Sequence, residues 1–460
     1  MTLPEVKQVH FIGIGGYGMS ALAQVLLQMG YRVTGSDIHD SALVRQLAAR
    51  GAEIKLFHHP DHIGSSELVI HSTAIPPDNC ELQEARRRGI PVWHRSELLA
   101  ALINSHYGIA VAGTHGKTTT STMIALLLEA AGLDPTALIG GVVSSFQSNA
   151  RFGRSRYLVA EACESDHSFL RYRPHIAVIT NVEADHLEHY QNDFSLMQRA
   201  YEAFLQNLHP DGWAVLCVDD PFLQELAHRA DQKVVTYGLA QNGAAYTGRE
   251  IALTGLGSSF TFYRRGEPLT GTVNLRVPGR HNVSNAVAAL AVAAELGLNP
   301  GRCAETLTEF RGAKRRFEVI GEVNGVTVID DYAHHPTEVR VTLEAARAAG
   351  KRVCCIFQPH RYSRTAYFFE EFARSFDDAD LVLLHRIYSA GEKPLEGITS
   401  EALARRISEI KGQQVYWSDE MAELGRMALD WVRPGDLIIV MGAGDISGLA
   451  YILVHNYNKK

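Results

Sequence analysis

The first hundred residues alternate short apolar segments with amphipathic ones. Residues 9–16, VHFIGIGG, predict a buried strand and a turn, and residues 17–30 predict a helix that ends at Gly30. Residues 31–37, YRVTGSD, predict a second strand, and the segments ELVIHSTAI and IPVWHR continue the alternation. Strands that alternate with helices favour a mostly parallel sheet covered on both faces.

A second α/β unit begins near residue 107, where the apolar segment YGIAVA precedes a glycine-containing turn and a long helix-like stretch. The segments YLVAEAC, HIAVITNV and WAVLCVDD predict further buried strands. Between residues 258 and 278, polar and apolar residues alternate about a turn at Arg265–Pro268, which predicts a small antiparallel subsheet. The segment GRHNVSNAVAALAVAAELG then predicts a helix.

The alternation resumes after residue 314, where VTVIDDYAHHP, KRVCCIFQPH, DLVLLHRIY and DLIIVMGAGDISG predict strands between helices. The pattern therefore predicts an α/β protein of three domains. We expect an N-terminal Rossmann-like domain in residues 1–103 and a C-terminal Rossmann-like domain in residues 315–460. Between them, residues 104–314 predict a P-loop-type ATPase domain with a parallel sheet and the small antiparallel subsheet. No Pro- or Ser-rich linker separates the three units.

Composition narrows the class of protein. The chain has 460 residues, of which 46% are hydrophobic, enough to fill about three cores. Its net charge of −7 excludes a generally basic nucleic-acid binder. No run of about 18 apolar residues and no signal-like start are present, so we expect a cytoplasmic protein without a membrane partner.

The six cysteines include no CxxC pair, which predicts reduced thiols and neither a disulfide framework nor a zinc site. Cys354 and Cys355 are adjacent in an apolar segment that predicts a strand. Their side chains should therefore point to opposite faces of that strand.

The first turn carries the motif GIGGYG, in which Gly13, Gly15 and Gly18 form a GxGxxG pattern between a strand and a helix. Asp37 ends the next predicted strand. Such glycines let the backbone approach a diphosphate at the N-terminus of the helix. Taken alone, the motif indicates NAD or FAD, but a UDP group needs the same diphosphate binding. A plain strand–turn–helix without a ligand is the remaining alternative.

The strongest motif is GTHGKTT, which follows the strand-like segment GIAVA and precedes a helix. The backbone N–H groups of such a loop cradle phosphates, a lysine neutralises charge on the β and γ phosphates, and a threonine hydroxyl ligates Mg²⁺. The spacing is shorter than in GxxxxGK[ST], because Val111 and Ala112 stand where the leading glycine would be. The residues expected at ATP are Gly113, Thr114, His115, Gly116, Lys117, Thr118 and Thr119.

Glu161 and His186 each follow a predicted strand at its C-terminal end, where open α/β sheets place their ligands. A carboxylate and an imidazole at this position can hold Mg²⁺ against the γ-phosphate. A zinc cluster of His186, Glu188 and His189 is an alternative that no further ligand spacing supports. A solvent-facing loop histidine is the other alternative for His186.

His281, Asn282 and Asn285 lie at the start of a predicted helix. The two asparagines are three residues apart, so both could face one side and bind a base edge, although Asn282 is equally suited to cap the helix. In the third unit, Arg361 and Arg364 suit a clamp for a carboxylate or phosphate, or form a solvated helix end. Other candidates there are Arg315, Arg316, Asp330, Asp331, Tyr332, His334, His335 and His360. Residues 86–88, three arginines without a companion motif, predict a surface segment.

These motifs, in this order, resemble the Mur ligase family of peptidoglycan synthesis. The resemblance rests on GTHGKTTT, EACESD, NVEADH, PGRHNVSNA, KRRFE, DDYAHHPTE and QPHRYSRT. It implies an ATP- and Mg²⁺-dependent ligase that joins L-alanine to UDP-N-acetylmuramate through an acyl phosphate, acting as a monomer or homodimer. A related family member attaches a recycled peptide to the same sugar nucleotide, but typically has a cysteine in the first glycine turn, which GIGGYG lacks. An NAD-dependent oxidoreductase and an ATP-driven switch protein are alternatives from other classes.

The resemblance also implies roles for individual residues. The sugar nucleotide would be bound by Gly13, Gly15, Gly16, Gly18, Asp37, Ser72, Thr73 and Ala74. Lys117 would serve the ATP phosphates, and Thr118, Glu161 and His186 would hold the metal. His281 and Asn282 would contact adenine, while Arg316 and Asp331 would close over ATP. L-alanine would be positioned by Tyr332, His334, Arg361 and Arg364, with His334 as a candidate proton acceptor. No lysine lies between Lys117 and Lys233, so the carbamylated lysine of other branches is absent.

Overall fold

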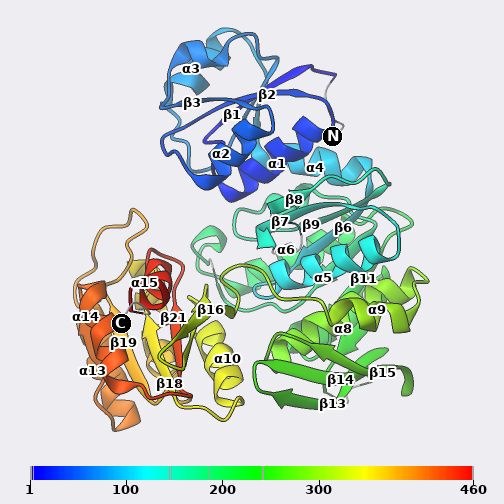
Figure 1. The fold of residues 1–460 in the computed structure, drawn as a ribbon. Coiled ribbons are helices and arrows are strands. Elements are labelled where there is room, and N and C mark those ends of the chain that lie inside the picture. The colour runs from blue at the N-terminus through cyan, green and yellow to red at the C-terminus, as the bar shows by residue number, and fades with distance from the viewer. Residues whose placement is uncertain are drawn as a thin grey trace. The chain divides into compact units, whose positions relative to one another are not determined.

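The protein is built around three β-sheets, which Figure 1 shows in blue, in cyan to green, and in yellow to red. The computed structural model describes residue 3 and residues 5–143, 146, 148–185, 187–240 and 243–457. The predicted α/β class is confirmed. The chain forms two compact units, of which the first contains Met1–Arg249, Thr261–Val273 and Ser284–Leu307, and the second Glu250–Phe260, Asn274–Val283 and Thr308–Lys460.

The first sheet has five parallel strands in the order β3-β2-β1-β4-β5. Its strands are β1 (Gln8–Ile12), β2 (Arg32–Asp37), β3 (Glu53–Leu56), β4 (Leu68–His71) and β5 (Val92–His94). Its helices are α1 (Tyr17–Gln28), α2 (Ala42–Ala49), η1 (Pro60–Ile63), α3 (Cys80–Arg87) and α4 (Arg95–Ser105). Every residue of β1 is buried, because this strand lies at the centre of the sheet. The strand that the sequence pattern did not predict, β3, lies at the edge and has a largely exposed sequence, EIKL.

The second sheet has ten strands in the order β15-β14-β13-β12-β11-β10-β6-β9-β7-β8. The strands are β6 (Tyr107–Ala112), β7 (Thr136–Val143), β8 (Ser148–Arg151), β9 (Tyr157–Glu161), β10 (Ile176–Ile179), β11 (Trp213–Cys217), β12 (Lys233–Gly238), β13 (Tyr246–Thr254), β14 (Gly257–Arg264) and β15 (Glu267–Leu275). Six neighbouring strands of the sheet are parallel to one another, namely β12, β11, β10, β6, β9 and β7. The strand β8 is antiparallel to β7. Two-residue connections join β13 to β14 and β14 to β15. The strands β14 and β15 lie in the segment predicted to form the antiparallel subsheet, whereas β13 was not predicted.

The helical segments of this central region run along the chain between its strands. They are α5 (Lys117–Ala130), η2 (Ser168–Arg171), η3 (Leu187–Tyr190), α6 (Phe194–Gln206), α7 (Pro221–Arg229), α8 (Arg280–Glu295) and α9 (Pro300–Leu307). Because β6 ends directly before α5 and is flanked by β9 and β10, the turns that follow these three strands meet at one edge of the sheet.

The third sheet has six strands in the order β16-β17-β21-β18-β19-β20. All are parallel except β16, which pairs with β17 in the antiparallel sense. The strands are β16 (Glu318–Val323), β17 (Val326–Asp331), β18 (Val353–Phe357), β19 (Leu381–His385), β20 (Tyr416–Ser418) and β21 (Leu437–Met441). The helices are α10 (Pro336–Arg347), α11 (Tyr362–Tyr367), α12 (Phe369–Ala373), α13 (Ser400–Lys411), α14 (Met421–Trp431) and α15 (Ser447–Tyr457).

The two adjacent cysteines of β18 belong to different cores, with Cys355 packed on one side of the sheet and Cys354 on the other, as predicted. All six cysteines carry free thiols, and four of them are buried. Among the described residues, no helix has both the length and the apolar character needed to cross a membrane.

Helix α1 of the first sheet packs against β7 and β8 of the second sheet through buried polar side chains. Gln24 Nε2 donates to the Ala150 carbonyl at 2.8 Å, and Gln24 Oε1 accepts from Ser148 Oγ at 2.8 Å. Asn149 Nδ2 donates to the Tyr17 carbonyl. This contact therefore depends on matched hydrogen bonds as well as on apolar packing.

Candidate functional site

The GIGGYG segment forms a strand–turn–helix, in which β1 ends at Ile12 and α1 begins at Tyr17. The amide groups of Gly13 and Ile14 donate to the Ser36 carbonyl at 2.8 and 3.0 Å. Gly15 N donates to Asp37 Oδ2 at 2.7 Å. The Asp37 carboxylate is buried and bound to the glycine turn, so it fixes the shape of this turn.

The loop after β4 lies against the same turn. Ser72 is half-buried, and Thr73 and Ala74 are exposed. A methyl group on Gly13 would lie 3.0 Å from Ile75 Cδ1, so this loop and the glycine turn are neighbours. The structure thus brings together the residues predicted to bind a sugar nucleotide.

Arg95 also lies at this turn, although the sequence pattern did not single it out. A methyl group on Gly18 would lie 3.5 Å from Arg95 Nη1, and Arg95 Nη2 pairs with Asp166 at 3.3 Å. Arg95 could have been predicted from its position directly after β5, because the turns that follow β1 and β4 lie at the same edge of the sheet. Arg95 supplies a positive charge beside the N-terminus of α1, where an anion would bind.

The buried carboxylate of Glu81 contacts Ser36, the residue whose carbonyl binds the glycine turn. Glu81 Oε2 accepts from Ser36 Oγ at 2.6 Å, and Glu81 is fully buried. Three histidine rings surround it, with His58 Nδ1 at 3.3 Å, His62 Nδ1 at 3.1 Å and His10 Nε2 at 3.6 Å. Burial alone would raise the pKa of Glu81, but the interactions with His10 and Ser36 outweigh it and lower the pKa to about 2.

The second candidate loop runs from Gly113 to the start of α5 at Lys117 and requires two of its glycines. Gly113 has a φ of 130°, and a methyl group there would clash with Thr180 Oγ1. Gly116 has a φ of 83°, and a methyl group there would clash with Asn285 Oδ1. The loop therefore follows a backbone path that only glycine allows at these positions.

The residues after β10 hold this loop in place. His115 N donates to Asn181 Oδ1 at 2.8 Å, and Thr114 N donates to the Asn181 carbonyl at 3.1 Å. Thr114 Oγ1 accepts from Glu183 N at 2.8 Å. Asn181 and Glu183 were not predicted as part of the loop; the signal was that the strand preceding NVEADH is a neighbour of β6.

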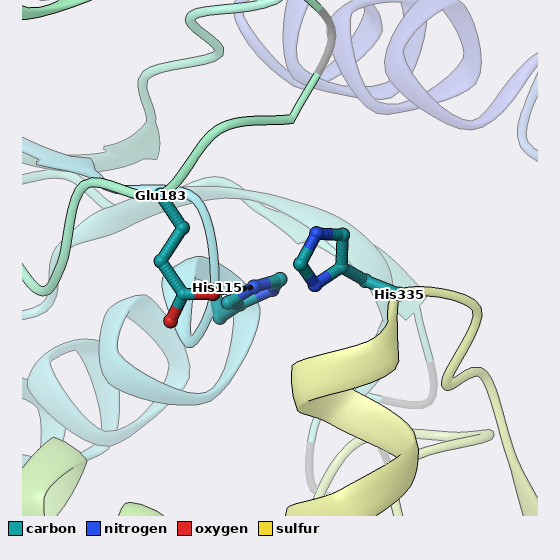
Figure 2. Close-up of side chains that lie close together, drawn as sticks. All are labelled: His115, Glu183 and His335. Atoms are coloured by element: carbon teal, nitrogen blue, oxygen red, sulfur yellow. Dashed lines mark ion pairs between the residues drawn. The ribbon is translucent and has the colours of Figure 1, made fainter. Parts of the chain in front are cut away.

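Figure 2 shows that His115 and Glu183 point toward each other, with 3.6 Å between His115 Nε2 and Glu183 Oε2. His335, which is also labelled there, belongs to the other unit and caps α10 by accepting from Thr337 N. The carboxylate of Glu183 therefore lies beside His115 of the candidate phosphate loop.

The Lys117 ammonium is held inside the loop. Lys117 Nζ donates to the carbonyls of Gly113 and Thr114 at 2.5 and 3.1 Å. It also lies 3.1 and 3.0 Å from the two carboxylate oxygens of Glu164, which is 1% exposed. Burial lowers the pKa of Lys117, but the charge of Glu164 more than compensates, so the net pKa is raised. Glu164 is the second glutamate of EACESD, whereas the sequence prediction chose only the first.

Thr118 and Glu161 both lie next to β7, where Glu161 contacts Gly140 and Thr118 is near Gly141. Gly140 N donates to Glu161 Oε1 at 2.6 Å, and a methyl group on Gly141 would lie 3.5 Å from Thr118 Cγ2. Their hydroxyl and carboxylate oxygens are the kind of ligand that Mg²⁺ prefers. The third expected ligand, His186, lies outside the described residues.

The two predicted asparagines of α8 differ in their contacts. Asn285 Oδ1 accepts from Thr120 Oγ1 at 3.2 Å, so Asn285 touches the phosphate loop and its helix. Asn282 Nδ2 donates to the Pro278 carbonyl at 2.7 Å. The alternative that Asn282 caps the helix is wrong, because α8 begins two residues earlier, at Arg280. His281 is half-buried in the first turn of the same helix.

In the second unit, side chains that follow β17 and β18 lie together. The rings of Tyr332 and His334 are 5.1 Å apart, and those of His334 and His360 are 5.9 Å apart. Arg364 Nη1 lies 3.3 Å from His360 Nδ1. Arg361 has a φ of 70°, a strained backbone conformation for a residue with a side chain, and such strain clusters at functional sites. The structure therefore gathers the residues predicted to bind an amino acid.

The other predicted residues of this unit differ in their environment. Asp331 accepts from the amides of Phe317 and Ala333, both at 2.7 Å, and burial raises its pKa to about 6. Arg316 lies over the Tyr332 ring and pairs with Glu338 at 3.4 Å. Arg315 donates to the Gly442 carbonyl and so braces the sheet. The arginines at 86–88 are exposed, as predicted.

Comparison with known proteins matches three family domains along the chain. They are described as "Mur ligase family, catalytic domain" at residues 8–107, "Mur ligase middle domain" at residues 111–293 and "Mur ligase, glutamate ligase domain" at residues 315–444.

Two relatives are both named UDP-N-acetylmuramate--L-alanine ligase. The protein of Pelotomaculum thermopropionicum is 49% identical over 96% of this chain and 96% of its own length. The protein of Symbiobacterium thermophilum is 48% identical over 98% of this chain and 94% of its own length.

Solved structures are also similar to this chain over nearly its whole length. UDP-N-acetylmuramate-alanine ligase MurC from Thermotoga maritima is 30% identical, with a TM-score of 0.82 over 98% of this chain and 99% of that chain. A murein peptide ligase from Psychrobacter arcticus is 26% identical, with a TM-score of 0.71 over 99% of both chains. Since these similarities in sequence and in fold extend over nearly the whole length, the chain belongs to the Mur ligase family.

Proposed function

We propose that this protein joins L-alanine to the lactyl carboxylate of UDP-N-acetylmuramate, with ATP converted to ADP and phosphate. The observation that carries this proposal is the near full-length identity of 49% to a relative named UDP-N-acetylmuramate--L-alanine ligase. The two phosphate-binding turns of the first unit support it, because the reaction needs one site for the sugar nucleotide and another for ATP.

The glycine turn of the first sheet suits the UDP diphosphate. Its backbone is fixed by Asp37 and Ser36, and the N-terminus of α1 offers N–H donors and a positive dipole to an anion. Arg95 adds a full positive charge there. The exposed loop of Ser72, Thr73 and Ala74 is available to the rest of the sugar nucleotide.

The loop before α5 suits ATP. Lys117 directs its ammonium into the loop, and the N-terminus of α5 follows it. Thr118 and Glu161 would hold Mg²⁺, which, when bound, neutralises charge on the phosphates. The roles expected for His186, His281, Asn282, Arg316 and Asp331 toward ATP and the metal remain part of this proposal.

The chemistry proceeds in two steps. The lactyl carboxylate attacks the γ-phosphorus of ATP, the bond between this phosphorus and the bridging oxygen breaks, and an acyl phosphate forms as ADP leaves. The amine of L-alanine then attacks the activated carbonyl, and phosphate leaves from the tetrahedral intermediate as the amide forms. Phosphoryl transfer depends mainly on positioning and charge neutralisation, so Lys117 should contribute most of the protein's share.

The cluster of the second unit suits L-alanine. Arg361 or Arg364 would pair with its carboxylate, and Tyr332 would pack beside it. His334 Nδ1 is 2.9 Å from the Tyr332 carbonyl, an arrangement that orients its ring. His334 would accept the proton that the attacking amine loses.

The proposal is tested by ADP release from the purified protein with Mg·ATP, UDP-N-acetylmuramate and L-alanine, each omitted in turn. We expect release only when all three substrates are present. Release without the sugar nucleotide would refute the ligase function and favour an ATP-driven switch. Turnover with a tripeptide but not with L-alanine would instead assign the peptide-adding activity, and reduction of NAD would assign an oxidoreductase.

A further inference from the structure

The ammonium of Lys117 has no spare donor in this structure. An ammonium group carries three N–H donors, and here they serve the Gly113 carbonyl, the Thr114 carbonyl and the Glu164 carboxylate. A phosphate oxygen that binds Lys117 must therefore replace one of these three partners. The environments of these three partners indicate which of them a phosphate oxygen displaces most easily.

Replacement of Glu164 would leave a charge buried without a partner. Its carboxylate is 1% exposed, and Tyr190 Oη donates to its backbone carbonyl at 2.6 Å, which fixes this segment. A buried carboxylate that loses its ion pair is strongly destabilised. The Thr114 carbonyl is neutral and its bond to Lys117, at 3.1 Å, is longer than that of Gly113, so its loss costs far less.

We propose that Glu164 is a positioning residue that keeps the Lys117 ammonium at the phosphate loop when nucleotide binds, and that a phosphate oxygen takes the place of the Thr114 carbonyl. Glu164 thus acts on the nucleotide only through Lys117. This inference rests on the proposed function in one respect, namely that the loop binds ATP or ADP.

The test is calorimetric binding of Mg·ADP to the full chain at neutral pH, without sugar nucleotide or amino acid. For Glu164→Gln we expect an affinity about tenfold weaker than that of the wild-type protein, because the ammonium loses the charged partner that holds it at the loop. Glu164→Asp, which keeps the negative charge, should recover part of this loss. The matched control is Glu129→Gln, which removes a half-exposed carboxylate from the far end of the same helix and should behave as wild type.

Two results would overturn the inference while leaving the proposed function intact. Tighter binding by Glu164→Gln would show that Glu164 competes with the phosphate for Lys117, and binding equal to that of the wild-type protein would show that Glu164 does not position the ammonium. If the wild-type protein binds neither Mg·ADP nor Mg·ATP, the proposed function fails first and the inference fails with it.

A second measurement guards against a folding defect. We expect Lys117→Met and Glu164→Gln each to lower the urea midpoint of unfolding, and the double variant to lower it less than the sum of the two. That pattern measures the coupling of the pair without any nucleotide. Strictly additive effects would contradict the role of Glu164 as the partner of Lys117.

Discussion

At the scale of single residues, the buried carboxylate of Glu81 is connected to the glycine turn through Ser36. It binds Ser36 Oγ, and the carbonyl of the same serine accepts from Gly13 and Ile14. Removal of this carboxylate would therefore loosen the backbone on which a diphosphate is expected to rest. Because its pKa lies far below the ordinary 4.5, Glu81 also makes the stability of the fold depend on pH.

We expect Glu81→Gln to reduce stability most at neutral pH. A carboxyl group whose pKa is lowered by folding stabilises the native state above its unfolded pKa and loses this effect as pH falls through its native pKa. With the pKa at about 2, the gap in unfolding free energy between wild type and variant should shrink by about 2 kcal/mol from pH 5 to pH 3. Urea unfolding of both proteins at several pH values measures this gap, and a constant gap would contradict the prediction.

The predictability of single residues depended on whether their role is local. Lys117 and Asp37 stand at fixed places in motifs that join a strand to a helix, so their positions followed from the sequence. Glu164 and Arg95 matter through partners in distant segments of the chain, namely the ammonium of Lys117 and the turn at Gly18. No spacing rule along the chain encodes such contacts, because they exist only after the strands assemble.

At the scale of elements, the contact between α1 and the strands β7 and β8 depends on Gln24. Its side chain uses both polar atoms, one toward Ser148 and one toward Ala150, and is 6% exposed. This pairing connects the helix of the first glycine turn to the second sheet. Its loss would remove the acceptor of the buried Ser148 hydroxyl and the side-chain donor to the Ala150 carbonyl, which costs more than the gain from a less polar side chain.

We therefore expect Gln24→Met, which keeps a similar volume, to lower the unfolding free energy by about 1–3 kcal/mol. Gln28→Met is the control, since Gln28 lies at the exposed end of the same helix and its loss should cost within about 0.5 kcal/mol. Chemical denaturation of the three proteins decides the matter. Equal losses from both substitutions would show that the buried hydrogen bonds add nothing.

Elements were predictable where their burial was strong. The central strands β6, β10 and β21 appear in the sequence as apolar runs, and β1 is apolar except for Gln8 and His10; all four were predicted. Several of the missed strands lie at or near sheet edges and are short, like β20, partly polar, like β8, or exposed, like β3. The strand β12 was also missed, although it lies inside its sheet, because its sequence KVVTYG mixes polar and apolar residues. An edge strand is stabilised by its single neighbour, so its own sequence carries little periodic signal.

At the scale of the whole molecule, the two turns that we propose to bind phosphate belong to different sheets, so a substitution in one should not impair binding at the other. We expect Lys117→Ala to reduce ADP formation by at least about a hundredfold, because a charge that stabilises phosphoryl transfer is removed. Binding of UDP-N-acetylmuramate, measured by calorimetry, should stay within about twofold of wild type. The control is Lys233→Ala, an exposed lysine of β12.

Lost sugar-nucleotide binding in Lys117→Ala would contradict the assignment of UDP and ATP to separate sheets. The three-sheet organisation itself followed from the alternation of strand and helix patterns. The expected boundaries near residues 103 and 314 remain predictions, because no change in composition marks them.

Two of the native cysteines are positioned for attachment of a reporter dye near the two glycine-containing turns. Of the six cysteines, Cys80 and Cys163 are half-buried and the other four are buried. Cys80 precedes Glu81 beneath the glycine turn, and Cys163 precedes Glu164 beside the phosphate loop. Of these two thiols, that of Cys163 should react more slowly with maleimides. Burial and the charge of Glu164 raise its pKa, and the thiolate is the reactive form. The native sequence thus offers one attachment point for an environment-sensitive dye near each of the two turns proposed to bind a nucleotide, without an engineered cysteine.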